Sequence, residues 1–222
     1  MEPSLVEPLL ARSIDDFRSE RLGLSFYQRD ALDVAPDLLG TFVGHRTGSG
    51  EFRAARIVET EAYRGPTDGA CHARAGLTKR TRTLLGPPAH AYVFLIYGMY
   101  DCFNIVCFGE GKGHAVLVRA GEPVHGIPPG LRTDGPGRLT RAMGITRVHD
   151  TWDLTSSSLY VAPRARRPRI DTTARVGVGY AGKWAEEPWR FLDTASKYVS
   201  RPAARFIGQG LTVRSAKTRA SG

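Results

Sequence analysis

Two glutamates and a tyrosine occupy alternate positions in the segment RIVETEAY, as Glu59, Glu61 and Tyr63. The β-branched Ile57 and Val58 that precede them favour a strand. Because alternate side chains of a strand share a face, the three functional groups point the same way. Two carboxylates and a phenol make a poor dry core but suit the floor of a water-filled, concave site. The alternative is an edge strand with a polar outer face.

The paired carboxylates also suggest a second hypothesis, an enzyme that hydrolyses carbohydrate. Residues two apart on a strand lie about 7 Å from each other, which is within the range for inverting glycosidases. Glu59 and Glu61 would nevertheless stand side by side rather than on opposite sides of a substrate. The net charge of +9 also suits no neutral sugar.

A second unusual feature is an aromatic turn. The apolar run 91–106 predicts two strands that meet at Tyr97-Gly98-Met99-Tyr100. Turn tips are normally built from Asn, Asp, Gly and Ser. Aromatic side chains exposed at such a tip suit insertion into a base stack. The alternative is that Tyr97 and Tyr100 cap the core.

Charge and cysteine content narrow the class of protein. A net charge of +9 over 222 residues indicates a polyanionic partner, nucleic acid before anionic membrane, although compositional drift toward arginine is the alternative. Cys71, Cys102 and Cys107 form no CxxC pair, which argues against a disulfide framework and a zinc site and favours a reducing compartment. We expect no signal peptide, because the N-terminal segment MEPSLVEPLL has acidic residues, two prolines and no apolar core. We also expect no membrane span, because no apolar run approaches the required length of about 20 residues.

Local patterns predict the elements around these groups. They are a helix over 31–40, strands over 41–45, 51–63, 114–120 and 189–192, one or two strands within 152–161, a strand and turn over 175–182, and loops over 64–88 and 121–137. Cys71-His72 in the first loop could form a nucleophilic dyad, although adjacent residues rarely do. A glycine loop and a short helix over 135–145 could hold a phosphate, reinforced by Arg138 and Arg141.

These segments carry a family likeness when they are taken together and in order. The alkyladenine (3-methyladenine) DNA glycosylase family of the vertebrate type is what they resemble, over about residues 22–191. The motifs are RIVETEAY with His72, Tyr97-Gly98-Met99-Tyr100 with Asn104, Gly135-Pro136-Gly137 before Leu139, and Arg175-Val176-Gly177-Val178-Gly179 with Trp184.

The resemblance implies an α+β fold, a single mixed domain around a curved, mainly antiparallel β-sheet with flanking helices and a protruding β-hairpin. We expect a lead-in over 1–21, the glycosylase domain over 22–207 and a basic, flexible tail over 208–222. The expected setting is the bacterial cytoplasm near the nucleoid, where the protein acts as a monomer on double-stranded DNA and not on a membrane.

The implied activity is excision of alkylated or deaminated purines, of the 3-methyladenine, hypoxanthine and ethenoadenine class. The nucleotide is flipped out of the duplex, and a Glu-activated water hydrolyses its N-glycosidic bond. No metal or cofactor is expected, and no lyase step, because the lysines match no Schiff-base position of the family. The alternative is a non-catalytic nucleic-acid-binding module that binds without releasing a base.

Site residues follow from the resemblance by position. Glu61 matches the general base, and Arg119 a polar group near the attacking water and the DNA backbone. The groups that sandwich and contact the flipped base match Tyr63, His72 and Phe94, with Asn104 facing the purine 2-position. Tyr97 matches the intercalating wedge and Met99 a second hairpin-tip contact. Phe94 stands where the family often has Tyr, so stacking is retained but any bond made by the hydroxyl is lost.

Overall fold

The computed structural model describes residues 20–164 and 166–200. Nearly all of the predicted lead-in and the whole of the predicted tail lie outside the described residues. None of the helices in these ranges has the length and apolar character needed to cross a bilayer.

One curled sheet of eight strands organises the chain, in the order β3-β4-β5-β2-β1-β6, with β8 added to β2 and β7 to β8. Every pairing is antiparallel. The strands are β1 (Phe42–Arg46), β2 (Phe52–Arg64), β3 (Ala91–Ile96), β4 (Tyr100–Cys107), β5 (His114–His125), β6 (Leu159–Ala162), β7 (Ile170–Thr173) and β8 (Arg190–Asp193). Together with its few helices, this sheet confirms the expected single α+β domain.

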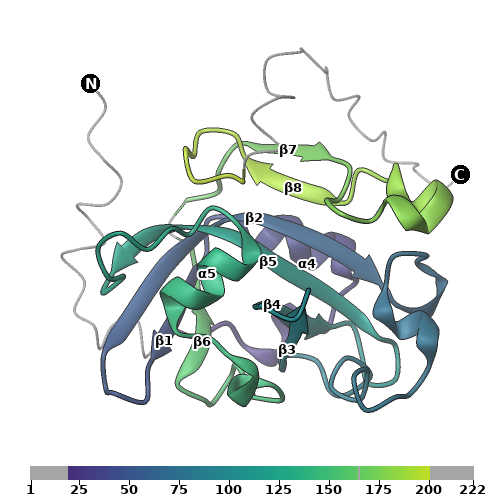
Figure 1. Ribbon diagram of the computed structural model, residues 1–222, viewed down its shortest axis with the longest axis horizontal. Coiled ribbons are helices and arrows are strands. Elements are labelled where there is room, and N and C mark those ends of the chain that lie inside the picture. The colour runs from purple at the N-terminus through teal and green to yellow at the C-terminus, as the bar shows by residue number, and fades with distance from the viewer. Residues whose placement is uncertain (1–19, 165, 201–222) are drawn as a thin grey trace, which may run out of the picture.

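The helices lie on both faces of the sheet, with α5 in front of β5 and α4 behind it (Figure 1). In the described ranges they are α3 (Leu24–Tyr27), α4 (Ala31–Leu38), α5 (Pro136–Met143) and the 3₁₀ helices η1 (Gly65–Thr67), η2 (His72–Ala75), η3 (Arg147–His149) and η4 (Gly179–Ala185). The predicted helix over 31–40 is confirmed. The Asp30 side chain caps it by accepting the Leu32 N–H, and Val34 and Leu38 are buried against the sheet.

β2 is the longest of the described strands, and it changes neighbours halfway along. Its first half pairs with β1, from Phe52 opposite Arg46 to Arg56 opposite Phe42. Further along, Glu59 to Glu61 pair with β8. β5 pairs with β2 along almost the whole length of β2, and the register of this pairing shifts on both sides of Glu59. Thr60 bonds to the Ala35 carbonyl on the α4 side. The two glutamates therefore face the opposite side, the side of α5, as the alternation in RIVETEAY predicts.

Two sequence predictions are wrong in detail. The predicted loop over 121–137 begins too early, because β5 runs to His125 and the long β2 supplies partners even for Gly121 and Pro123. Residues 175–182 form no strand; η4 begins at Gly179, and the preceding residues have no neighbouring strand to pair with. The prediction of one or two strands within 152–161 is confirmed by one strand, β6, which begins at Leu159.

Candidate active site

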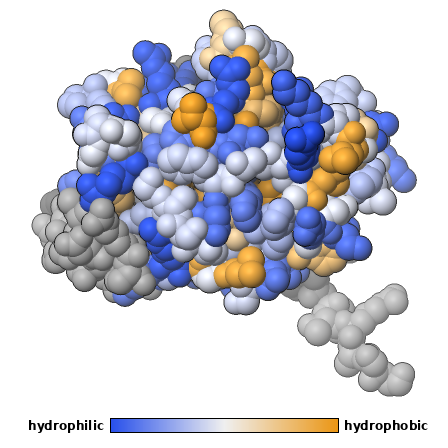
Figure 2. All heavy atoms as spheres, turned by 90° about the horizontal axis from the view of Figure 1, so that it is seen from below, coloured by the Kyte–Doolittle hydropathy of each residue, from blue (hydrophilic) through white to orange (hydrophobic). Residues whose placement is uncertain are grey.

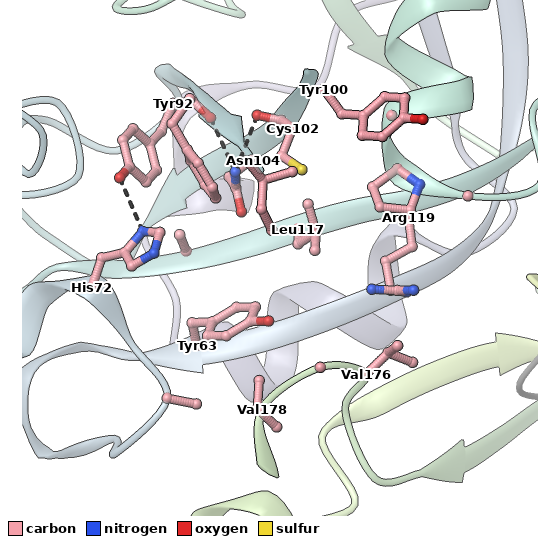
Figure 3. A pocket seen from close by; sticks show the side chains of 18 of the residues that line it. Tyr63, His72, Tyr92, Tyr100, Cys102, Asn104, Leu117, Arg119, Val176 and Val178 are labelled. Atoms are coloured by element: carbon pink, nitrogen blue, oxygen red, sulfur yellow. Dashed lines mark hydrogen bonds between the residues drawn. The ribbon is translucent and has the colours of Figure 1, made fainter. Parts of the chain in front are cut away.

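A cavity of about 580 Å³ opens on the α5 side of the sheet. Tyr63 of β2 and Arg119 of β5 form its floor, Asn104 of β4 lies on one side, and Val176 and Val178 lie on the other (Figure 3). This volume falls within the range of small-molecule sites and suits a purine.

One wall of the cavity is aromatic. The His72 and Phe94 rings are 4.7 Å apart edge to face, and Tyr92 packs 5.1 Å from Phe94. The Tyr92 hydroxyl lies 3.1 Å from His72 Nδ1, the contact dashed in Figure 3. Burial, aided by the charge of Arg80, lowers the pKa of His72 to about 4. At neutral pH the wall is therefore uncharged and suited to stacking. Tyr92 was not among the predicted site residues.

Tyr63 connects the cavity to the carboxylates. Its hydroxyl donates to Glu61 Oε2 at 2.9 Å, and the Arg175 guanidinium lies 4.8 Å from its ring centre. Burial and the adjacent Glu61 charge raise the pKa of the Tyr63 phenol. The phenol thus stays a hydrogen-bond donor, with its ring available to the cavity.

Glu61 lies directly beneath the cavity lining. Its side chain is fully buried. Its carboxylate accepts hydrogen bonds from the Val176 N–H, at 2.8 Å, and from the Tyr63 hydroxyl. It also forms an ion pair with Arg119 Nη1 at 3.3 Å. All three partners line the cavity. The prediction of a water-exposed floor is therefore wrong for both glutamates, because Glu59 is fully buried too.

Arg119 stands between the two glutamates. Its Nε donates to Glu59 Oε1 at 2.7 Å while its Nη1 faces Glu61. Burial alone would lower the pKa of Arg119, but the charges of Glu61 and Glu59 outweigh it and raise that pKa. The structure thus brings the predicted pair Glu61 and Arg119 together on adjacent strands.

A buried ion pair that sequence reasoning missed holds the opposite wall. Arg175 Nη2 donates to Asp68 at 2.9 Å, and Arg175 Nη1 to the Ala62 carbonyl at 2.9 Å. Both side chains of the pair are inaccessible to solvent. These bonds tie residue 175 to β2, so that the next N–H, that of Val176, reaches Glu61. An acidic residue in a Gly/Pro-rich loop is so common that Asp68 gave no sequence signal.

Asn104 is buried at the cavity wall. Its amide nitrogen donates to the carbonyls of Tyr92 and Cys102, at 3.1 and 3.4 Å. Two bonds to backbone groups of the β3–β4 pair fix the plane of the side chain. Asn104 is therefore a rigid projection into the cavity (Figure 3).

The hairpin tip exposes its apolar side chains. Tyr97 is 78% and Met99 70% exposed, so the alternative that Tyr97 caps the core is wrong. Tyr97 also has φ of 52°, a left-handed conformation that costs a bulky residue about 1–2 kcal/mol. Tyr100, by contrast, packs against the start of α5, where a Cβ on Gly137 would lie 2.7 Å from its own. Among the residues that the structure describes, nothing in the fold accounts for a ring at position 97.

Arg138 and Arg141 of α5 both lie at the cavity mouth and are exposed. Arg138 Nη1 makes a 3.3 Å ion pair with the Asp134 carboxylate and donates to the Asp134 carbonyl at 3.4 Å, and no side chain caps the first turn of α5. The helix start therefore offers free N–H groups beside two cations, as a phosphate contact requires. The face of the molecule drawn in Figure 2 is mostly hydrophilic, with separate apolar groups rather than one large patch.

The cysteines are poorly suited to nucleophilic chemistry. Burial raises the pKa of both Cys71 and Cys102 to about 11. The Cys71 thiol lies 3.5 Å from the Gly113 carbonyl, to which it donates. The Cys71-His72 dyad is therefore excluded as an activated nucleophile at neutral pH.

The sequence analysis also did not predict a second exposed aromatic side chain at the cavity rim, besides Tyr97. Tyr180 of η4 is 70% exposed and lines the cavity. The prediction of a strand and turn over 175–182 gave no reason to place this side chain at a site. Gly69 permits the adjacent packing, because a Cβ there would lie 2.3 Å from the Trp184 ring.

Known proteins resemble this chain over most of its length. The model of the methylpurine-DNA glycosylase (MPG) family matches residues 25–197. A protein of Myxococcus xanthus is 52% identical over 179 residues, covering 80% of this chain and 92% of the relative. One of Legionella pneumophila (strain Corby) is 46% identical over 183 residues, covering 82% and 98%. Both carry the name "Putative 3-methyladenine DNA glycosylase". With a family model spanning the whole cavity-bearing domain, the chain belongs to the methylpurine-DNA glycosylase family and is a DNA glycosylase.

Proposed function

We propose that this enzyme removes 3-methyladenine and related alkylated or deaminated purines, including hypoxanthine and ethenoadenine, from duplex DNA. The observation that carries the proposal is the position of Glu61. Its carboxylate is buried under an aromatic, purine-sized cavity and is held by three groups that themselves line the cavity.

The chemistry assigned to Glu61 is proton abstraction from water. The C1′–N bond breaks and its electron pair leaves with the base, while the water oxygen bonds to the oxocarbenium-like C1′. The proton lost by the water passes to the carboxylate. Arg119, 3.3 Å from the same carboxylate, lies where it can orient the water. A 3-methyladenine base is already cationic and leaves as a neutral molecule.

Access to C1′ requires the nucleotide to leave the helix. Extrusion costs a few kcal/mol, and stacking on aromatic side chains returns about 1–3 kcal/mol per base. Tyr63 and the wall of His72 and Phe94 offer such stacking surfaces in the cavity. Tyr97, exposed at the hairpin tip, is assigned to the gap left in the duplex, with Met99 beside it.

A single assay tests the proposal. A labelled duplex with one hypoxanthine is incubated with the protein, treated with hot alkali and resolved on a gel, beside a duplex treated with a methylating agent. We expect strand breaks at the lesion only. Binding without breaks would identify a non-catalytic nucleic-acid-binding module, and neither binding nor breaks would favour a carbohydrate-directed enzyme. Breaks before alkali would contradict the absence of a lyase step. Gel filtration with and without the duplex tests the predicted monomer.

A further inference from the structure

Glu59 is buried two residues before Glu61 and takes no part in the proposed reaction. Its Oε1 accepts Arg119 Nε at 2.7 Å, Arg190 Nε at 2.8 Å and the Ser200 hydroxyl at 2.9 Å. Its Oε2 accepts the Ser200 N–H at 2.7 Å. Glu59 is absent from the cavity lining. Any effect it has on the reaction must therefore pass through a neighbour.

That neighbour is Arg119, which the two glutamates share unequally. Its contact with Glu59 is 2.7 Å, whereas its contact with Glu61 is 3.3 Å. A guanidinium is planar, so a short bond at Nε fixes the plane in which Nη1 lies. Without that bond, the Arg119 guanidinium could rotate and form two parallel hydrogen bonds with the Glu61 carboxylate. A carboxylate paired in that way is a weaker base and has fewer lone pairs free for water.

Charge balance supports the same assignment. Burial alone would raise the pKa of Glu59, but the charges of Arg119 and Arg190 outweigh it and lower that pKa. Glu59 is therefore ionised in the folded protein. With Glu61 it balances the two arginines, and buried charges are tolerated only when they are paired in this way.

The other groups that face Glu61 offer no substitute for Glu59. Tyr63 from β2 donates to it, Cys102 from β4 is a protonated thiol, and Arg175 is already paired with Asp68. None of them carries a negative charge free to hold Arg119. Removing the Glu59 charge thus leaves one uncompensated cation beside Glu61.

We propose that Glu59 is a positioning residue, which anchors Arg119 through Nε so that Glu61 is not neutralised by a close ion pair. The proposal rests on the proposed function, in which Glu61 is the base. It assigns a role to a side chain that the substrate never touches.

The test compares pH–rate profiles for single-turnover excision of hypoxanthine by the full-length protein. In Glu59→Gln, Arg119 moves toward Glu61, so the rate falls about tenfold and the acidic limb shifts down by about one pH unit. In Arg190→Gln, Glu59 keeps Arg119 as its one arginine partner and holds it more firmly, so the limb moves to higher pH. A purely structural role lowers the active fraction in both variants without moving either limb, and that result would overturn the proposal.

Two further measurements keep the test decisive. If Glu59→Gln does not fold, as judged by circular dichroism, Arg190→Gln alone decides, since a limb at higher pH supports the anchor and an unchanged limb overturns it. Glu61→Gln is assayed in parallel. Retained activity in that variant refutes the proposed function itself. An inactive Glu61→Gln beside a Glu59→Gln variant with the wild-type profile refutes only the anchor.

Discussion

The cavity floor and the hairpin tip invert the usual distribution of residues in opposite ways. At or beneath the floor, the acidic and basic side chains of Glu59, Glu61, Arg119 and Arg190 are nearly inaccessible to water. At the tip, Tyr97 and Met99 are large, apolar and mostly exposed. Charged residues are normally outside a protein and large apolar residues inside it.

The two regions differ in how the cost is compensated. Every buried charge under the floor has a partner within 3.3 Å in the free protein. The Tyr97 ring has no such compensation, and its backbone is held at φ of 52°. The floor is therefore complete before substrate arrives, whereas the tip finds its partner only in DNA. The chemistry should depend on the first region and access to the base on the second.

The largest effect is expected from Glu61→Gln. The amide keeps the shape and can still accept the Val176 N–H, but it cannot take a proton from water. Excision should fall by about 10³-fold or more, with binding to lesion-containing duplex nearly unchanged. Single-turnover kinetics and fluorescence anisotropy measure the two quantities.

A matched control for this variant must be chosen from the structure. Glu59→Gln should reduce excision much less than Glu61→Gln, but the ion pairs of Glu59 make it an unsuitable silent control. Glu110→Gln changes an exposed glutamate outside the cavity and should leave excision unchanged. Excision by Glu61→Gln at the rate of Glu110→Gln would refute the assignment of the base.

Tyr97→Ala should give the next largest effect. Without the ring, the hole left by an extruded base is unfilled and restacking competes, so excision should fall by about 10- to 100-fold, most for well-paired lesions. A fluorescent base analogue at the lesion reports extrusion directly. Equal signals for variant and wild type would exclude the wedge.

The same position separates function from folding. Tyr97→Asn introduces a residue that tolerates positive φ, so the free energy of unfolding should rise by about 1 kcal/mol while excision falls. Chemical denaturation measures the first quantity. A variant destabilised by this change would show that the ring contributes to the fold after all.

The contrast between the two regions also explains which parts could be predicted from sequence. The aromatic tip, helix α4 and the facing of Glu59 and Glu61 follow from local alternation and capping within a few residues. The partners of Glu59 come from Arg190 and Ser200, more than 100 residues away in the chain, and no local pattern encodes such a contact. The family likeness was needed to place Arg119 near Glu61.

Local composition gave the wrong secondary structure in two places where the availability of a neighbouring strand decided the outcome. Gly121 and Pro123 are typical of loops, yet the long edge of β2 holds them in β5. The reverse occurs at residues 175–178, where a strand-like sequence has no neighbouring strand and is held instead by the side chain of Arg175. Strand formation in both places was decided by the availability of a partner rather than by propensity.

A smaller effect, on DNA binding, is expected from changes to the arginines around the cavity mouth. If about four to six phosphates are neutralised, log K should fall against log[salt] with a slope of about −4 to −5. Arg138→Gln and Arg141→Gln should each reduce the magnitude of the slope by about 1, equally for damaged and undamaged duplex. Anisotropy titrations between low and moderate salt measure it. A slope near zero for the wild type would remove the electrostatic argument.

The smallest effect is expected at Asn104, and it is a gain. Guanine differs from hypoxanthine only by its exocyclic 2-amino group. An enzyme that accepts several purines needs a repulsive element against this abundant normal base. Asn104 can supply it, because two backbone bonds prevent its amide from moving aside. We therefore propose that its carboxamide clashes with the 2-amino group and leaves room for hypoxanthine.

Asn104→Ser tests the filter by removing the branched amide. Guanine excision should rise above background, most visibly opposite thymine, where pairing is weakest and extrusion costs least, while hypoxanthine excision is retained. The alternative is that Asn104 serves only to satisfy the carbonyls of Tyr92 and Cys102. In that case the variant loses thermal stability, and guanine release stays at background while hypoxanthine is still cut. Thermal denaturation beside the two excision assays separates these outcomes, because only a filter lets guanine release rise in a variant that still folds.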